Sequence, residues 1–449
     1  MLQPGHPRLL RGAGPNSGYL LQDKAAAIVI VVSSAVIYTV PVEIGVAVFL
    51  FEALLVGTIY QSRGILYPMG WFPPAYCAYS VTFAILALLY PAELSYDLDD
   101  YMIVVQMGLV GFWAAQLFNR QRERLIRFPS AASLELIAIW ILTGIAIVSL
   151  YYLQGLDVAN KRQLNEAASI VLGLFLVLSL FSVHMIALQT SRGELNWKLI
   201  GIIYAVLTLA YLISGERDLL FRVVLPHIFL FYTYNRRYSY RSYKIFLLFV
   251  AAAIVMPASQ MMKGIFLFNE DGLSSWSLYE ILKGEFTAAG KNLNVIMSGV
   301  VPPMHGETLI WDVKRVLSFI YTDQMSPAEW YNVYVRAWLG IEGTSGWGFS
   351  LLAEGYMNFG TAGAFAWMFA VGLAARAFHR LSNRSSIWFS IYLCQIPIMI
   401  YCLRADLANL ANLTIKVNLL VFTIIWLIQR FTPSKRVYNK ALAGGQTGL

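Results

Sequence analysis

Charged side chains are scarce in this chain of 449 residues. Asp, Glu, Lys and Arg make up 13% of it, whereas apolar residues make up 58%. A water-soluble domain usually carries about 25% charged residues. The shortage excludes a soluble globular enzyme and a disordered protein, and the mean hydropathy of +0.61 indicates that the bilayer is the main solvent of this chain.

Cysteine and nucleotide-binding motifs are also scarce or missing. The three cysteines, Cys77, Cys394 and Cys402, lie in apolar runs, where a thiol packs as a small hydrophobe. They form no C-x-x-C pair and no disulfide framework. The chain has no G-x-x-x-x-G-K-[ST] motif, no G-x-G-x-x-G that opens a helix after a strand, and no H-E-x-x-H. These absences argue against ATP-driven pumping by this chain alone, and we predict no cofactor.

Long apolar runs are what the sequence has in abundance. Twelve of them have the length of about 17–25 residues that a membrane-crossing helix needs. We therefore predict an all-α polytopic membrane protein with about 12 transmembrane helices and one large extracytoplasmic loop. Only Pro41 separates the first two runs, which form either a tight helical hairpin or one long kinked segment. The predicted spans are 25–40, 42–60, 69–90, 101–118, 134–152, 167–189, 198–214, 219–235, 245–261, 349–375, 386–403 and 413–429.

Basic residues are concentrated in every second connector between the spans. The positive-inside rule places these connectors, and both termini, in the cytoplasm. The net charge of +8 therefore reflects topology, and we predict no nucleic-acid partner. The first 24 residues have no apolar region followed by a cleavage site, so the first span is predicted to be an uncleaved anchor. The basic groups are Arg8, Arg11 and Lys24 with Arg63; Arg120, Arg122, Arg124 and Arg127; Arg192 and Lys198; Arg236, Arg237, Arg241 and Lys244; Arg376, Arg380 and Arg384; and Arg430, Lys435, Arg436 and Lys440.

One connector is much longer than the others. The predicted layout is a cytoplasmic tail (1–24), spans one to nine (25–261), an extracytoplasmic loop with short helices (262–348), spans ten to twelve (349–430) and a cytoplasmic tail (431–449). Loops longer than about 12–15 residues are usually functional. We expect helical stretches at Ser275–Glu285 and Ala328–Leu339. The loop holds Trp276, Trp311, Trp330, Trp338 and Trp347, which either anchor it at the membrane interface or stack on sugar rings.

Charges at the outer ends of spans are costly, so each is a functional candidate. The turn after span seven contains Arg217 and Asp218, and Arg222 follows four residues after Asp218, on the same helix face. Asp218 and Arg222 either form an internal ion pair that fixes packing, or belong to an anion site. Arginine suits the second role because its planar fork matches phosphate oxygens. Arg404 and Asp406, at the outer end of span eleven, either form a second such cluster or simply cap and anchor the helix.

The loop also contains the candidates for acid–base chemistry. His305 is the one histidine predicted to be both outside the cytoplasm and in a loop, and Glu307 lies two residues further on. Either is a candidate general base, and an ordinary exposed loop residue is the alternative. Arg336 is positioned to extend a basic funnel that includes Arg217. The run Asp97-Leu98-Asp99-Asp100 has carboxylates suited to a divalent metal, but such spacing is common in solvated loops, so we predict no metal.

Three segments resemble one family of membrane enzymes. Residues 350–374, SLLAEGYMNFGTAGAFAWMFAVGLA, place an acidic residue, an aromatic and Asn-Phe-Gly before a helix of small residues, after a long outer loop. This pattern, with Gly215–Arg217 and Arg404–Asp406, resembles the Wzy-type bacterial polymerases of O-antigen and exopolysaccharide repeat units. Independently of the family, Glu354 and Asn358 share a helix face, and Gly355, Gly360 and Gly363 are predicted to let neighbouring helices approach closely.

The resemblance implies a GT-C-like fold of ligase and polymerase type and a reaction at the outer face of the bacterial inner membrane. Such enzymes move a growing glycan from undecaprenyl pyrophosphate onto a lipid-linked repeat unit, without a nucleotide sugar. The resemblance also implies a chain-length-regulating co-polymerase as a partner. The candidate bases are Glu307, His305 and, as third choice, Glu354. The candidate pyrophosphate ligands are Arg217, Arg222, Arg336 and Arg404, with Asp218 and Asp406 as further site residues.

Two other functions stay open. A lipid-linked glycan ligase, or another multi-span glycosyltransferase, needs the same arginine-lined diphosphate site. A glycolipid flippase or transporter is the alternative from another class, because Pro226 and Pro397 fall within spans and could break their helices. Against a transporter, no inverted repeat is visible, and alternating access does not require a large loop on one side.

Overall fold

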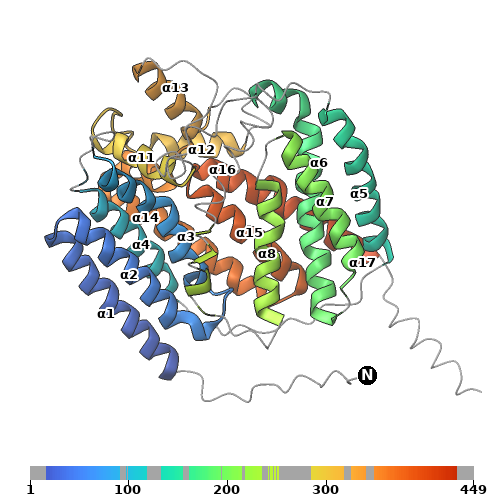
Figure 1. Cartoon of the computed structure of the whole chain (residues 1–449), viewed down its shortest axis with the longest axis horizontal. Helices are drawn as coiled ribbons and strands as arrows, with labels where there is room; N and C mark the ends of the chain where they lie inside the picture. Colours follow the sequence, from blue (N-terminus) through green and yellow to red (C-terminus); the bar gives the residue numbers. More distant parts are fainter. Residues whose placement is uncertain are drawn as a thin grey trace, which may run out of the picture.

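The computed structural model (Figure 1) describes residues 17–91, 98, 100–118, 133–154, 161–193, 195–214, 218–234, 241, 243–245, 247–248, 250–251, 285–317, 325–339 and 348–431. Within these ranges the regular elements are helical, without a strand. The helices are α1 (Ser17–Thr39), α2 (Val42–Tyr60), η1 (Gln61–Arg63), α3 (Pro68–Leu89), α4 (Tyr101–Gln116), α5 (Ser133–Gln154), α6 (Lys161–Arg192), α7 (Trp197–Ser214), α8 (Asp218–Tyr234), α11 (Glu285–Met297), α12 (Glu307–Val316), α13 (Pro327–Leu339), α14 (Leu351–Ser382), α15 (Ser386–Cys402), α16 (Leu407–Asn412), the π-helical η3 (Leu413–Leu419) and α17 (Leu420–Phe431).

The predicted all-α polytopic membrane protein is confirmed. Among the described residues, eight helical stretches are long and apolar enough to cross a membrane, and α4 and α15 are shorter apolar helices. The eighth predicted span corresponds to α8. The ninth, 245–261, lies mostly outside the described residues, so the total of twelve stays a prediction.

The first two spans form a hairpin rather than one kinked helix. Pro41 lies between them with extended backbone (φ −55°, ψ 154°), and α1 packs against α2. Arg63, in the short η1 that directly follows α2, is not an exposed surface charge. It is buried, pairs with Asp23 at 2.5 Å, and its guanidinium lies over the ring of Tyr60. The polar residues at this end of the hairpin therefore hold the two helices together.

Helix α14 is central to the bundle and packs most extensively against α4. Glycines make this close approach possible. A methyl group added at Gly372 would lie 2.8 Å from the carbonyl oxygen of Phe112, and one added at Gly111 would overlap the backbone of α14. Gln116 also donates across the interface to the carbonyl oxygen of Gly372 at 2.9 Å. The two helices are thus fastened by backbone contact as well as by apolar packing.

The described parts of the long loop belong to the bundle rather than to a separate domain. Helices α11, α12 and α13 gather with α16 at one end of the long helices (Figure 1). Helix α11 packs on α3, where the rings of Phe286 and Tyr79 are 4.7 Å apart. The predicted helix Ala328–Leu339 corresponds to α13. The predicted stretch Ser275–Glu285 lies outside the described residues except for its last residue.

Candidate active site

A sharp bend in α14 shapes the loop end of the bundle. The backbone leaves helical geometry at Phe359 (φ −143°, ψ 28°) and Gly360 (φ 61°, ψ −149°). The bend brings the two halves so close that a methyl group added at Gly355 would lie 2.6 Å from the carbonyl oxygen of Gly363. The prediction that these glycines serve neighbouring helices is therefore wrong for this pair, which meets within one helix. The short N-terminal half, 351–358, carries Glu354 toward α12 and α16.

Three buried carboxyls meet at the first turn of α16. The first N–H groups of a helix have no partner within it, and they favour negative charge. In α16 the first three each donate to a different acid, one from α14, one from α12 and one from the residue that precedes α16. The pairs are Leu407 N with Glu354 Oε2 (2.9 Å), Ala408 N with Asp312 Oδ1 (3.0 Å) and Asn409 N with Asp406 Oδ1 (2.7 Å).

The same acid network reaches α12 and α13. Thr308 donates its hydroxyl to Glu354 Oε1 at 3.1 Å, and Asn358 donates to the Thr308 hydroxyl oxygen at 2.7 Å. On the other side, the backbone N–H of Ala328 donates to Asp406 Oδ2 at 2.9 Å. Both oxygens of Glu354 and both of Asp406 are thus occupied within the protein. These two acids position the loop helices, and neither is exposed.

The surroundings of Asp312 favour its protonated form. Burial, followed by the neighbouring Glu354 and Asp406 carboxylates, raises the pKa of Asp312 well above its ordinary value of 3.8. Its Oδ2 is buried without another partner in the described part of the chain, and a proton there supplies a hydrogen bond to Glu354. Among the described residues, no group of three or more His, Cys, Asp or Glu side chains is arranged to hold a metal ion.

Two of the predicted phosphate ligands, Arg222 and Arg404, both lie near the ring of Tyr401. Tyr401 lies in the last turn of α15, which packs against α8. The guanidinium carbon of Arg222 is 5.9 Å from the ring centroid, and that of Arg404 is 5.7 Å from it. Arg222 is buried and Arg404 is half-buried. Two permanent positive charges therefore gather at the C-terminal end of α15, within three residues of the acid network at α16.

The other predicted ligands cannot be placed by their side chains. Arg217 lies outside the described residues, as do Asp97 and Asp99. Asp218 begins α8 and Arg336 lies in α13, but only their backbone is described. The expected ion pair between Asp218 and Arg222 therefore stays a prediction.

The two candidate bases of the loop are exposed and lie two residues apart in sequence, at the start of α12. His305 has a left-handed backbone (φ 46°) that non-glycine residues adopt uncommonly, and Glu307 is the first residue of α12. The turn is fixed onto the bend of α14 by two backbone donors. The N–H of Met304 donates to the carbonyl oxygen of Met357, and that of Gly306 donates to Asn358 Oδ1.

Aromatic residues cover the outer part of α13. Trp330 lies 5.5 Å from Trp311 of α12 and stacks on Tyr334 at 5.0 Å between ring centroids. A surface pocket of about 430 Å³ is lined by Trp330, Val333, Tyr334 and Trp338, and the Trp338 side chain is 60% exposed. Trp276 and Trp347 lie outside the described residues. We call the residues that line this pocket the α13 aromatic face.

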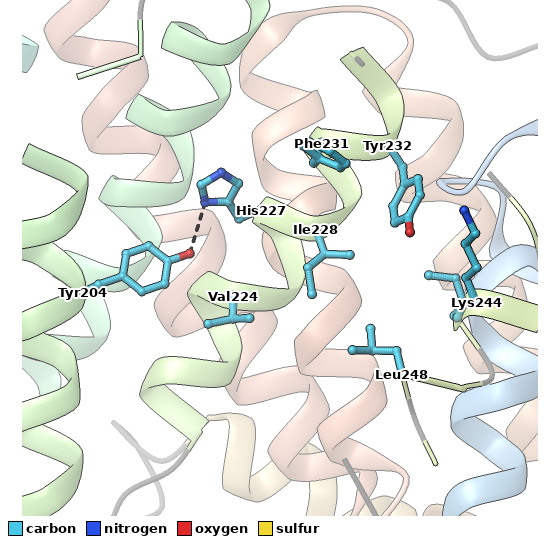
Figure 2. Close-up of a pocket in the computed structure, with 9 residues that line it drawn as sticks. Tyr204, Val224, His227, Ile228, Phe231, Tyr232, Lys244 and Leu248 are labelled. Atoms are coloured by element: carbon cyan, nitrogen blue, oxygen red, sulfur yellow. Dashed lines mark hydrogen bonds between the residues drawn. The ribbon is translucent and has the colours of Figure 1, made fainter. Parts of the chain in front are cut away.

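A second pocket lies away from these residues. It has a volume of about 450 Å³ beside α7 and α8 (Figure 2). There the Tyr204 hydroxyl lies 3.1 Å from His227 Nδ1, within hydrogen-bond distance. The lining residues of α8 recur at helical spacing on one face, and Arg222 points from another face toward α15. The pocket is therefore separate from the arginine pair. Its α8 residues are Val224, His227, Ile228, Phe231 and Tyr232.

Three site residues have no clear signal in the sequence. Asp312 and Thr308 lie four apart in α12, so they share the face that meets Glu354, and Tyr401 is one of 26 tyrosines. The helical spacing of Thr308 and Asp312 predicts a common polar face. It does not indicate that this face is buried, because that depends on α14 and α16.

Comparisons with known proteins support the resemblance over part of the chain. The family model for the O-antigen polysaccharide polymerase Wzy matches residues 328–436. This segment runs from α13 past α17 and contains Glu354, Tyr401, Arg404 and Asp406, whereas Arg222 and α12 precede it. No curated protein and no solved structure matches the chain. The predicted resemblance to the Wzy polymerases is confirmed for this segment.

Proposed function

We propose that this multi-pass membrane protein is a polysaccharide polymerase of the O-antigen type. It transfers a growing glycan from undecaprenyl pyrophosphate onto a lipid-linked repeat unit at the outer face of the bacterial inner membrane. The observation that carries the proposal is the pair of guanidiniums over Tyr401. The matched family segment, 328–436, supports the same conclusion because it contains one of the two arginines.

The arginines act on the leaving group. The acceptor hydroxyl attacks the anomeric carbon of the donor glycan while the bond from that carbon to the pyrophosphate oxygen breaks. The bonding electron pair goes to the lipid pyrophosphate, which gains negative charge. Arg222 and Arg404 stabilise that charge, with Arg217 and Arg336 as further ligands. Such stabilisation of developing charge is usually the largest single contribution in a site of this kind.

A base must accept the proton of the acceptor hydroxyl. His305 and Glu307 are exposed at the start of α12 and accessible to a substrate, which favours them for this role. Glu354 is fully buried, and both of its oxygens already accept hydrogen bonds. We therefore assign Glu354 to positioning α12 and α16 around the site. General bases typically contribute about 10²–10⁴-fold in rate.

The α13 aromatic face suits the sugar rings of the glycan. Flat, exposed aromatic rings bind the apolar face of a pyranose, and Trp330 and Trp338 flank one pocket. Helix α13 is attached to the acid network through the Ala328 N–H, which donates to Asp406 Oδ2. A glycan bound on this face would thus be held next to the reacting ends. Anchoring of α13 in the membrane interface is the competing role.

One assay separates the polymerase from its alternatives. Purified protein in vesicles is given lipid-linked repeat units of one size, and the products are resolved on a gel. A ladder of increasing lengths supports polymerisation, whereas a single transfer product identifies a ligase. Counterflow of labelled lipid-linked units without any change in glycan length identifies a flippase. Either of the last two results would reject the proposed function.

A further inference from the structure

Three arginines line a pocket at the other end of α14, remote from the proposed active site. Arg376 and Arg380 lie four residues apart in the last turns of α14, and Arg384 follows just after the helix ends at Ser382. The pocket has a volume of about 500 Å³, and Phe118 and Leu373 are among its apolar lining residues. None of these residues belongs to the proposed active site.

Among the described residues, none of the three arginines forms an ion pair with a carboxylate. Arg376 donates through Nη1 to the carbonyl oxygen of Ala115 at 2.6 Å, which fixes its position against α4. Its Nη2 is buried and has no hydrogen-bond partner among the described residues. Like charges at this spacing repel one another, so an anion in the pocket would stabilise the arrangement.

An apolar path leads from the arginines along α14. The Phe118 side chain is 72% exposed, and its ring meets that of Phe369 at 5.7 Å between centroids. Phe369 stacks in turn on Phe365, one helical turn nearer the bend, at 6.0 Å. A free phosphate would gain nothing from these apolar rings. A phospholipid would contact both surfaces, because its phosphate group binds the arginines and its acyl chain packs on the aromatic rings.

We propose that the pocket formed by Arg376, Arg380, Arg384 and Phe118 binds an anionic phospholipid of the cytoplasmic leaflet. The guanidiniums hold the headgroup phosphate, and one acyl chain lies along Phe118, Phe369 and Phe365. The positive-inside rule explains why basic residues occur at this end. It does not explain their convergence on one pocket with apolar lining residues. Basic pockets between transmembrane helices bind anionic headgroups in this way.

The test measures lipid retained by the full-length protein. Purified protein is titrated with phosphatidylglycerol or phosphatidylethanolamine, and bound lipid is counted by native mass spectrometry. We expect selective binding of phosphatidylglycerol. Arg380 and Arg384 are exposed, so the double variant R380Q/R384Q leaves the Arg376 contact intact and should fold. It should weaken phosphatidylglycerol binding by about 25-fold, since each basic residue near an anionic surface contributes about fivefold.

Two controls make the result specific. Arg430 lies over the ring of Trp426 at 5.6 Å, near the end of α17, and is predicted to face the same leaflet. R430Q should leave phosphatidylglycerol binding unchanged. Equal retention of the two lipids by the wild type, equal loss in R430Q, or unaltered binding in R380Q/R384Q would each overturn the proposal. Displacement of phosphatidylglycerol by an equal concentration of inorganic phosphate would overturn it too, because the pocket would then be a free-phosphate site.

Discussion

At the scale of single residues, Tyr401 determines where positive charge gathers. Two guanidiniums, from segments almost 200 residues apart in sequence, lie 5.9 Å and 5.7 Å from the centroid of its ring. Stacking on an aromatic face stabilises each cation and holds it in a fixed direction. A diphosphate that arrives at this end of α15 therefore meets preorganised charge, which costs no rearrangement during the reaction.

The substitution Arg404→Ala should nearly abolish chain elongation. Loss of one preorganised donor typically lowers the rate about 100-fold or more, and we expect that loss in the gel-ladder assay with unchanged amounts of protein in the membrane. Arg404→Lys should recover little, because an ammonium cannot form the bidentate contact. Arg430→Ala, which removes another arginine stacked on an aromatic ring, is the control. Full elongation by Arg404→Ala would reject the assigned role.

The proton on Asp312 should make stability depend on pH. The folded protein keeps this proton above the ordinary pKa of 3.8, whereas the unfolded chain releases it near that value. Its contribution is therefore complete at low pH and declines as the pH rises above about 4, by at most about 1.4 kcal/mol per pH unit.

Asp312→Asn mimics the protonated acid and should flatten this decline. The measurement is the Tm of purified wild type and variant from pH 5 to pH 8. Asn retains an acceptor for the Ala408 N–H and a donor toward Glu354, so folding should survive. Identical slopes in the two proteins would show that Asp312 does not carry a proton in the fold.

At the scale of elements, the bend in α14 brings residues of a membrane-spanning helix into the candidate site. An unbroken helix would carry Glu354 and Asn358 along the bundle axis. The bend at Gly360 instead directs them toward α12 and α16. There Glu354 accepts hydrogen bonds from the Thr308 hydroxyl and the Leu407 N–H, and Asn358 donates to the Thr308 hydroxyl oxygen. The loop helices are consequently held by polar contacts to the membrane-spanning part.

Gly360→Ala should lower both stability and elongation. The combination of φ 61° and ψ −149° is essentially restricted to glycine, so a side chain there costs about 1–3 kcal/mol. Thermal unfolding and the ladder assay measure the two effects. Gly144→Ala is the matched control, because this helical glycine of α5 has open space around it and alanine is the better helix former. Equal Tm values for the two variants would contradict the role of the bend.

The α13 aromatic face should affect glycan length more than bond formation. Trp338→Ala removes one exposed ring of the pocket, and we expect weaker acceptor binding by about tenfold at most. The KM for the acceptor should rise and products should become shorter, while the first transfer still occurs. Trp197→Ala, which removes an exposed tryptophan at the start of α7, should have neither effect. Unchanged product lengths together with protein lost from the membrane would instead identify an interfacial anchor.

At the scale of the whole molecule, two polar regions occupy the two ends of the bundle. The acid network and the arginine pair lie at the end that carries α12, α13 and α16, and the arginine pocket of α14 lies at the other. A third group of buried polar contacts, separate from both regions, joins α5, α6, α15 and α17. His184 meets Ser390 Oγ at 2.9 Å and Glu135 Oε1 at 3.4 Å, and Gln429 donates to Glu135 at 2.6 Å.

Fusion reporters should place the two ends on opposite sides of the membrane. The alternation of basic connectors predicts that both termini are cytoplasmic and that the loop 262–348 is outside. Alkaline phosphatase inserted after Gly299 should be active, whereas it should be inactive after Asn383. Green fluorescent protein at the C-terminus should fluoresce. The reverse pattern would move the proposed reaction to the cytoplasmic face and reject the proposed function.

Much of the fold follows from the sequence, because hydropathy and connector charge are local properties. The apolar runs correspond to the helices wherever the structure describes them, and α13 was predicted within one residue at its start. Arg222 and Arg404 were recognisable as candidates because charge at the end of a membrane helix is costly wherever the rest of the chain lies.

The site itself was decided by the tertiary structure. Nothing local in the sequence indicates that Tyr401 lies near both arginines, that Thr308 and Asp312 face Glu354, or that Gly355 meets Gly363 across a bend. Each of these depends on contact between segments far apart in the chain or on one unusual backbone conformation. The apolar runs that suit a bilayer determined the helices, because hydropathy is a local property. Only the packing of those helices on one another brought the charges together.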